Sequence, residues 1–219
     1  MLKYKLVLFD FDGTLGDTLP WFQSAFDLVG QQYGIRKLTP LDHERLRECD
    51  TREMLKELKV PLWKVALMAA EMRKLMASRI SETKLFPGTS GLLESLSRSG
   101  VRLGIVSTNS YDNISNILGP DNTALIRYFE CGVSLFGKAA KLRKALRASR
   151  IPAGEALYVG DELRDLNAAR AAGLAFGAVT WGYNSVSAFQ KRAPEEIFPT
   201  MEQMVQRLSS EMRNMQPMS

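Results

Sequence analysis

Short apolar runs that stop abruptly at polar residues recur along the chain. The first run, Leu6–Phe9, ends at Asp10-Phe11-Asp12. A run of this composition predicts a buried parallel strand, and open α/β sheets bind ligands at the carboxyl ends of such strands. Because side chains alternate along a strand, Asp10 and Asp12 start on the same side. Two carboxylates therefore face one small volume at the mouth of a crevice.

A carboxylate pair of this kind repels itself unless a cation neutralises it or one member keeps its proton, so it is seldom only structural. The alternative is a simple turn, in which Asp12-Gly13 is the turn dipeptide. On either interpretation, Gly13 lets the backbone turn sharply after the pair.

Later segments repeat the pattern of a strand followed by polar residues. The run at 101–106 ends at Ser107-Thr108-Asn109, the run at 155–160 continues into Asp161, and a last strand is expected at 175–180. A short strand is also expected near 131–135. The expected helices between these strands cover residues 89–99, 113–118, 139–149 and the segment after Asp161. Alternating strands and helices predict a doubly wound parallel sheet, whose polar clusters converge in one site.

The segment from 16 to 84 has a different pattern. Its apolar residues recur at helical spacing, and we expect helices at about 19–33, 40–49, 51–58 and 61–80 with no strands. An all-helical block of this length, placed between two strands, indicates an insertion rather than a crossover helix. The methionines of its last helix are interpreted as packing residues rather than as a binding groove.

Composition narrows the class of protein. The 219 residues suffice for one core, or for one core and a small inserted domain, and the net charge of +5 suits an anionic substrate. That charge by itself is too weak to indicate a nucleic-acid partner. The sequence also lacks interleaved aromatic residues and a concentrated basic stripe, which such a partner would require. Two separated cysteines and the single His43 argue against zinc and disulfides.

The chain begins almost directly with the first strand, and no apolar run approaches the roughly 20 residues that a bilayer requires. We therefore expect a cytoplasmic protein with no membrane partner and no nucleic-acid partner.

Four motifs carry a family resemblance over nearly the whole chain. The segment Asp10-Phe-Asp-Gly-Thr-Leu15 resembles the first signature of the haloacid dehalogenase-like (HAD) superfamily of phosphohydrolases, in its phosphoglycolate phosphatase-like branch. Ser107, the segment 136–138 and the segment 160–165 resemble the second, third and fourth motifs. The resemblance implies a Rossmann-like α/β core formed by residues 1–15 and 85–219. Residues 16–84 would form a helical cap that selects a small phosphorylated metabolite.

The resemblance also implies roles for individual residues. Asp10 would be the nucleophile that forms an aspartyl phosphate, Asp12 the general acid and base, and Lys138 the cation that offsets the charge of Asp10 and the phosphate. The implied phosphate-binding residues are Ser107, Thr108, Asn109 and Lys138. The implied ligands of Mg²⁺ are Asp10, Asp12 through its backbone carbonyl, Asp161 and Asp165.

Several alternatives stay open at this point. Either Thr108 or Asn109 could reach the ligand, and Lys141 is an alternative to Lys138 as the third-motif lysine. Asp165 could bind the metal directly or indirectly. Arg52 could reach the site from the inserted helices. Asp12 argues against a dehalogenase, because dehalogenases of this fold lack the second aspartate. A phosphomutase of the β-phosphoglucomutase type shares all four motifs, and a non-catalytic binding module on the same fold is a further alternative. We expect a monomer or a weak homodimer.

Overall fold

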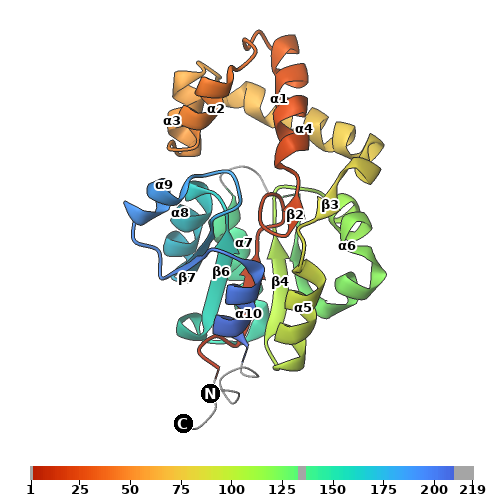
Figure 1. The fold of residues 1–219 in the computed structure, drawn as a ribbon, viewed down its shortest axis with the longest axis vertical. Helices are drawn as coiled ribbons and strands as arrows, with labels where there is room; N and C mark the ends of the chain where they lie inside the picture. The colour runs from red at the N-terminus through yellow and green to blue at the C-terminus, as the bar shows by residue number, and fades with distance from the viewer. Residues whose placement is uncertain (1, 133–136, 210–219) are drawn as a thin grey trace.

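The computed structural model describes residues 2–132 and 137–209. Its main sheet has six parallel strands in the order β5-β4-β1-β6-β7-β8. The strands are β1 (Leu6–Phe9), β4 (Arg102–Val106), β5 (Ile126–Glu130), β6 (Ala156–Gly160), β7 (Ala175–Val179) and β8 (Glu196–Phe198). Because helices connect these strands and cover both faces, the predicted doubly wound α/β class is confirmed (Figure 1).

The first strand lies in the centre of the sheet. Phe9 is in register with Ile105 of β4 on one side and with Val159 of β6 on the other. The strands therefore end at nearly the same level, and the polar residues that follow each of them meet at one edge of the sheet.

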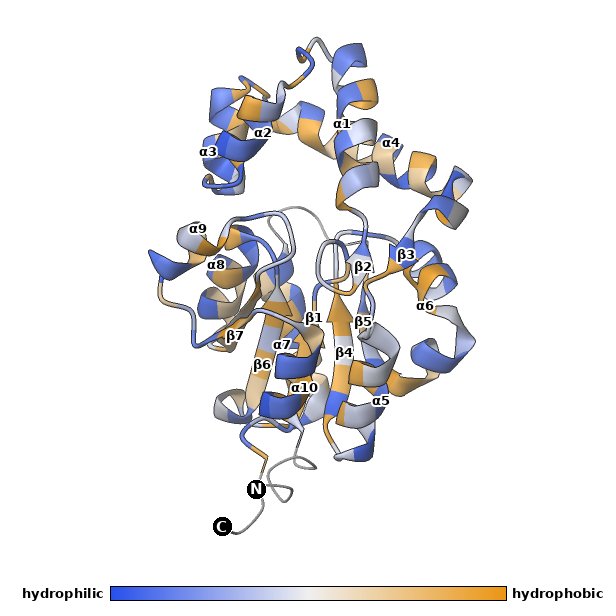
Figure 2. Cartoon of the chain, viewed as in Figure 1, coloured by the Kyte–Doolittle hydropathy of each residue, from blue (hydrophilic) through white to orange (hydrophobic). Residues whose placement is uncertain are grey.

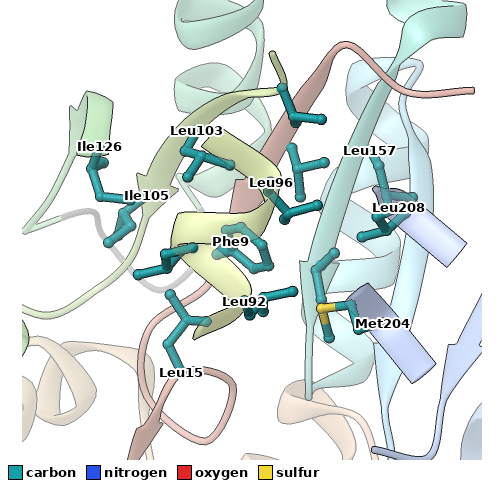
Figure 3. Close-up of a cluster of buried hydrophobic side chains, with 14 of the residues drawn as sticks. Phe9, Leu15, Leu92, Leu96, Leu103, Ile105, Ile126, Leu157, Met204 and Leu208 are labelled. Carbon is teal, nitrogen blue, oxygen red and sulfur yellow. The ribbon is translucent and has the colours of Figure 1, made fainter. Parts of the chain in front are cut away.

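Each face of the sheet is covered by a helical layer. One face packs against α5 (Thr89–Arg98), α6 (Tyr111–Leu125) and α10 (Met201–Leu208); Figure 3 shows Phe9, Leu96 and Met204 within this core. The other face packs against α7 (Lys138–Ser149), α8 (Leu163–Ala172) and α9 (Val186–Gln190). The strands β1, β6 and β7 carry no charged residue, because both faces of the sheet are covered. Figure 2 shows hydrophobic colours along β6 and β7.

Four helices lie beyond the carboxyl edge of the sheet (Figure 1). They are α1 (Leu19–Gln32), α2 (Pro40–Leu46), α3 (Thr51–Glu57) and α4 (Leu62–Ser78), followed by the short 3₁₀ helix η1 (Ile80–Glu82). Their buried side chains, among them Val29, Leu55 and Met68, form a cluster separate from the two that flank the sheet.

The prediction that residues 16–84 contain no strand was wrong at both ends of the segment. β2 (Gly16–Asp17) and β3 (Lys84–Leu85) pair antiparallel and form a two-stranded ribbon with two residues in each strand. The chain leaves the region of the sheet through β2 and returns to it through β3. Strands this short carry no alternating pattern, so sequence periodicity cannot reveal them.

Further differences concern the edges of the sheet. The strand expected near 131–135 was placed wrongly, because the structure has β5 at Ile126–Glu130; residues 133–135 lie outside the described part. Arg127 is exposed on this edge strand and Glu130 pairs with lysines, so charges interrupt its apolar pattern. The sequence pattern also predicts none of the elements β8, α9 and α10. Within the described ranges, no helix has both the length and the apolar character needed to cross a membrane.

Candidate active site

A buried lysine joins two aspartates at the carboxyl edge of the sheet. Nζ of Lys138, at the start of α7, lies 2.5 Å from Oδ2 of Asp10 and 2.6 Å from Oδ1 of Asp165. All three side chains are almost completely buried. The rival Lys141 lies one turn further along α7 and pairs with Glu130 at 3.0 Å. The structure thus brings Lys138, and not Lys141, into contact with Asp10.

Asp161 stands beside this group, at the end of β6. Its Oδ1 accepts a 3.0 Å hydrogen bond from Oγ1 of Thr14, and its Oδ2 accepts a 2.9 Å hydrogen bond from the backbone N–H of Tyr183. The backbone approaches very closely at Gly13, where an added Cβ would lie 2.2 Å from Oδ2 of Asp161. Gly13 also has a φ of +70°, so both the turn and the contact require glycine.

Asp12 is held by neighbours from two directions. Nδ2 of Asn109 donates a 3.1 Å hydrogen bond to its Oδ1, and the hydroxyl of Thr18 bonds to the same carboxylate. Thr18 precedes α1 and makes no side-chain capping bond there; its Oγ1 instead accepts from the backbone N–H of Gly13 at 3.2 Å. Thr18 therefore supports the turn that carries Asp12.

The residues after β4 divide into a buried pair and one that faces open space. Ser107 is fully buried, and its Oγ accepts from the backbone N–H of Asn109 at 3.1 Å. Oδ1 of Asn109 accepts from Nδ2 of Asn113 at 3.0 Å, which fixes the orientation of its amide toward Asp12. Thr108 is half-buried and lines the neighbouring cavity together with Asn109.

Burial dominates the electrostatics of the cluster. It raises the pKa of Asp10 to about 7, against the opposing charge of Lys138, and it raises the pKa of Asp12 despite the hydrogen bonds from Asn109 and Thr18. Burial, followed by the repulsion of Glu162 and the other carboxylates, raises the pKa of Asp161 well above its usual range. Burial alone would lower the pKa of Lys138, but the charges of Asp10 and Asp165 outweigh it and the net shift is upward.

The donor set suits a small divalent cation. Carboxylate oxygens of Asp10, Asp161 and Asp165 all lie within 4.8 Å of one another, and all three residues are buried. One lysine cannot balance three buried carboxylates, and oxygen ligands are those that Mg²⁺ prefers. The carboxylate of Asp12 is not part of this group, so the expected contribution of Asp12 through its backbone carbonyl stays a prediction.

A cavity of about 510 Å³ opens directly above the cluster. Asp12, Thr108, Asn109 and Asp161 lie on its floor, and residues of α1, α3 and α4 form its walls. Arg73 of α4 lines the cavity, and its Nη1 lies 3.5 Å from the backbone oxygen of Thr108. Arg73 is thus a basic residue that α4 brings to the site, and a role for Arg52 stays a prediction.

Comparisons with known proteins agree with this geometry. The family model of the haloacid dehalogenase-like hydrolases matches residues 7–179. The chain belongs to this family. It is 29% identical over 210 residues to the phosphoglycolate phosphatase of Synechococcus elongatus, a match that covers 95% of this chain and 99% of that protein. It is 30% identical over 190 residues to the phosphoglycolate phosphatase of Xanthomonas campestris pv. campestris, covering 82% and 84%.

Solved structures of the same family share the fold. A Bacteroides fragilis protein classed as a haloacid dehalogenase-like hydrolase superposes with a TM-score of 0.77 at 27% identity, covering 92% of this chain and 100% of that one. A haloacid dehalogenase-like family protein from Streptococcus pneumoniae gives 0.74 at 21% identity, covering 93% and 97%. The predicted family, its phosphoglycolate phosphatase-like branch and the enzyme class, a phosphoric monoester hydrolase, are confirmed.

Sequence reasoning missed several residues that shape the site of this haloacid dehalogenase-like hydrolase. Thr14 lies inside the first signature, so its contact with Asp161 could have been suspected. The contacts of Thr18, Arg73 and Tyr183 arise from segments distant along the chain or from loops with no recognisable motif. Only the folded arrangement reveals them.

Proposed function

We propose that this enzyme hydrolyses a phosphomonoester through an aspartyl phosphate on Asp10, with Mg²⁺ bound by Asp10, Asp161 and Asp165. The observation that carries the proposal is the contact of Lys138 with both Asp10 and Asp165, next to a cavity whose floor contains Asp12 and Asp161. A nucleophile, a proton donor and positive charge are the parts that phosphoryl transfer requires, and all three meet here.

In the first step, a carboxylate oxygen of Asp10 attacks phosphorus and the bond from phosphorus to the ester oxygen breaks. Lys138 favours the ionised, nucleophilic form of Asp10, because its ammonium group lies against that carboxylate. The raised pKa of Asp12 suits a carboxyl group that holds a proton and delivers it to the leaving alkoxide.

In the second step, water attacks phosphorus and gives its proton to Asp12. The bond between phosphorus and the Asp10 oxygen breaks, which releases inorganic phosphate and restores the free carboxylate. Bound Mg²⁺ would supply positive charge that neutralises the carboxylates and the phosphate oxygens. Ser107, Thr108, Asn109 and Lys138 are the proposed donors to those oxygens. Oγ of Ser107 is held in place by the hydrogen bond that it accepts from the backbone N–H of Asn109.

The same proposal assigns residues 16–84 to a cap and residues 1–15 and 85–219 to a core. Two observations support the division: the inserted helices have their own buried cluster, and the chain passes between the two regions through the β2–β3 ribbon. The cavity lies where these regions meet, so the cap would hold the part of the substrate beyond the phosphate and exclude water.

The test is phosphate release from a panel of small phosphomonoesters, with Mg²⁺ and with a chelator. Wild type should release phosphate only when Mg²⁺ is present, and Asp10→Asn should abolish turnover while far-ultraviolet circular dichroism stays unchanged. Incubation with labelled substrate followed by acid quench should trap label on wild type and none on Asp10→Asn. Turnover by a folded Asp10→Asn variant would remove Asp10 from its proposed role.

A further inference from the structure

The cavity above the carboxylates differs sharply between its floor and its walls. The floor is polar and comes from residues that follow the strands, whereas the walls come from α1, α3 and α4. We call the apolar part of the walls the upper chamber; its principal side chains are Trp21, Phe22, Phe26, Met54, Met68 and Met72. With the phosphate bound at the floor, the rest of a substrate would extend toward these side chains.

The methionines take part in this chamber. Met68 and Met76 are each only 4% exposed, yet both line the cavity, as does Met72. The interpretation of these side chains as packing alone was therefore incomplete, because they pack among the helices and also face the space above the site. Methionine is unbranched and polarisable, so it adapts to apolar groups of varied shape.

Charged groups lie at the floor end of the cavity. Arg164, in the first turn of α8, is bound to Glu162 through two hydrogen bonds of 2.7 Å, and both residues follow Asp161 closely in the chain. Arg73 lies beside Thr108, at the level of the proposed phosphate site. Among the lining residues that the described helices α1, α3 and α4 contribute, Arg73 is the one charged side chain.

An aromatic contact lies within the cavity lining as well. The rings of Phe22 and Tyr183 meet edge to face with centroids 6.3 Å apart, and the hydroxyl of Tyr183 contacts Sδ of Met54 at 3.4 Å. Phe22 belongs to α1 and Tyr183 to the loop after β7, so apolar contact continues from the inserted helices onto the core.

We infer that the substrate is a phosphomonoester whose leaving group is an uncharged alkyl or aryl skeleton, held in the upper chamber. This inference rests on the proposed phosphomonoesterase function and specifies its substrate class. A cavity of about 510 Å³ lies within the range of sites that bind drug-sized ligands. A charged group carried into the upper chamber would find no charged partner among the side chains that form it, and burying an unpaired charge there is costly. The two-carbon skeleton of phosphoglycolate would stay near Arg73 and Arg164 at the floor end and leave the chamber unfilled. An alkyl chain would instead displace water from the chamber.

The test compares ethyl, butyl and hexyl phosphate with phosphoglycolate as substrates of the Mg²⁺-loaded wild-type enzyme. The three alkyl esters have leaving alcohols of nearly equal acidity, so differences in kcat/KM report on binding of the chain. Burial of each methylene should raise kcat/KM by about fourfold until the chamber is filled. Hexyl phosphate should exceed both ethyl phosphate and phosphoglycolate.

A matched pair of variants on α4 locates the effect. Met72→Gln places a polar amide in the chamber and should lower kcat/KM for hexyl phosphate by a larger factor than for ethyl phosphate. Leu67→Gln makes a comparable change on the same helix, at an exposed position outside the cavity lining, and should leave the chain-length dependence unchanged. Inhibition of wild type by ethyl-, butyl- and hexylphosphonate needs no variant and should strengthen with chain length.

The outcomes separate the two proposals. Hydrolysis of esters with a flat or falling dependence on chain length, or with phosphoglycolate preferred, overturns the inference while the phosphomonoesterase function stands. If no ester is hydrolysed and the phosphonates do not bind, the function itself fails. Rising kcat/KM together with rising phosphonate affinity supports both.

Discussion

The ammonium group of Lys138 lies 2.5 Å from the carboxylate of Asp10, and neither side chain is more than 2% exposed. Replacing Lys138 with methionine would keep most of the side-chain volume but leave Asp10 and Asp165 as uncompensated neighbours. Removal of one partner from a buried ion pair costs about 3–5 kcal/mol. We expect Lys138→Met to lose that much free energy of unfolding in urea titrations and to lose phosphatase activity.

Lys141→Met is the matched control. Lys141 lies on the same helix and forms an ion pair with Glu130, but its side chain is 39% exposed. Its replacement should cost less than about 1 kcal/mol and leave activity near the wild-type level. Equal effects of the two substitutions would contradict the special position of Lys138.

Magnesium should stabilise the folded enzyme, since the carboxylate cluster exists only in the native state. At a concentration one hundred times its Kd, a ligand that binds only the native state adds about 2.7 kcal/mol. Thermal unfolding should therefore shift upward with Mg²⁺, and the shift should disappear with EDTA. Asp161→Asn should remove most of it, whereas Asp121→Asn, at an exposed position of α6, should retain it. An unchanged magnesium shift in Asp161→Asn would argue against the proposed metal site.

Substitutions at two glycines with positive φ distinguish the effect of backbone strain from the effect of steric crowding. Gly13 has φ +70° and would place a Cβ 2.2 Å from Asp161, whereas Gly34 has φ +77° and no atom within 4 Å of such a Cβ. Gly34→Ala should cost about 1–2 kcal/mol of stability and retain activity. Gly13→Ala should lose activity as well, because Asp161 must move. Thermal unfolding and phosphate release measured on both variants test this difference.

Asn184 ties the loop between α2 and α3 to the core. Its Nδ2 donates to the backbone oxygens of Arg47 at 2.7 Å and Cys49 at 3.0 Å, and its Oδ1 accepts from the backbone N–H of Leu163 at 2.7 Å. Asn184→Ala would leave these groups unsatisfied, at about 1–3 kcal/mol for each that stays buried. We expect faster hydrogen exchange at the amides of Leu163 and Ser185.

Asn122→Ala provides the comparison for that experiment. Asn122 is also buried, but its amide bonds within the core, to Oγ of Ser90 and the backbone oxygen of Leu118. Its loss should destabilise the core without selectively speeding exchange at Leu163 and Ser185. The same exchange pattern in both variants would mean that Asn184 has no specific linking role.

Glu48 gives the loop between α2 and α3 a dependence on pH. Hydrogen bonds from Ser185, Ser187 and Lys191 hold the pKa of Glu48 at about 2. Because this pKa lies below the ordinary value, the carboxylate contributes stability above about pH 4.5, and the contribution is lost as pH falls toward 2. The side chain is 38% exposed, so screening limits the effect to about 1 kcal/mol or less.

Urea titrations of wild type and Glu48→Gln from pH 7 to pH 3 test that sign. The difference in unfolding free energy should be largest near neutral pH and should narrow with acidification. A difference that grows as pH falls would contradict the depressed pKa of Glu48.

The sequence predicted the centre of the sheet and the convergence of its polar residues. β1 and β6 are apolar throughout, β4 is interrupted only by Arg102 at its start, and the motif residues follow the ends of all three strands. It did not predict β5 correctly, or β8 at all, since edge strands carry charges and are short. A strand that is buried on both faces has an apolar sequence that can be recognised, whereas an edge strand carries polar and charged residues that obscure this pattern.

The same division holds for the candidate site. Asp10, Asp161, Asp165 and Lys138 could be named from motifs, and the structure brings them together. Thr18 contacts Gly13 and Asp12 across the turn that follows β1, where no motif marks it. Arg73 carried no signal either, because its contact with Thr108 depends on how α4 packs above the sheet. Contacts between segments far apart in sequence leave no periodic trace.

The paired strands β2 and β3 place the exit of the chain beside its return, at Gly16 and Leu85. Residues between them can therefore lengthen, shorten or be exchanged without displacing any strand of the main sheet. Evolution could alter the chamber walls in this way while leaving the aspartates and Lys138 in place. The same adjacency marks 18–83 as a natural unit for grafting, in which a transplanted set of helices would carry its substrate preference to another core.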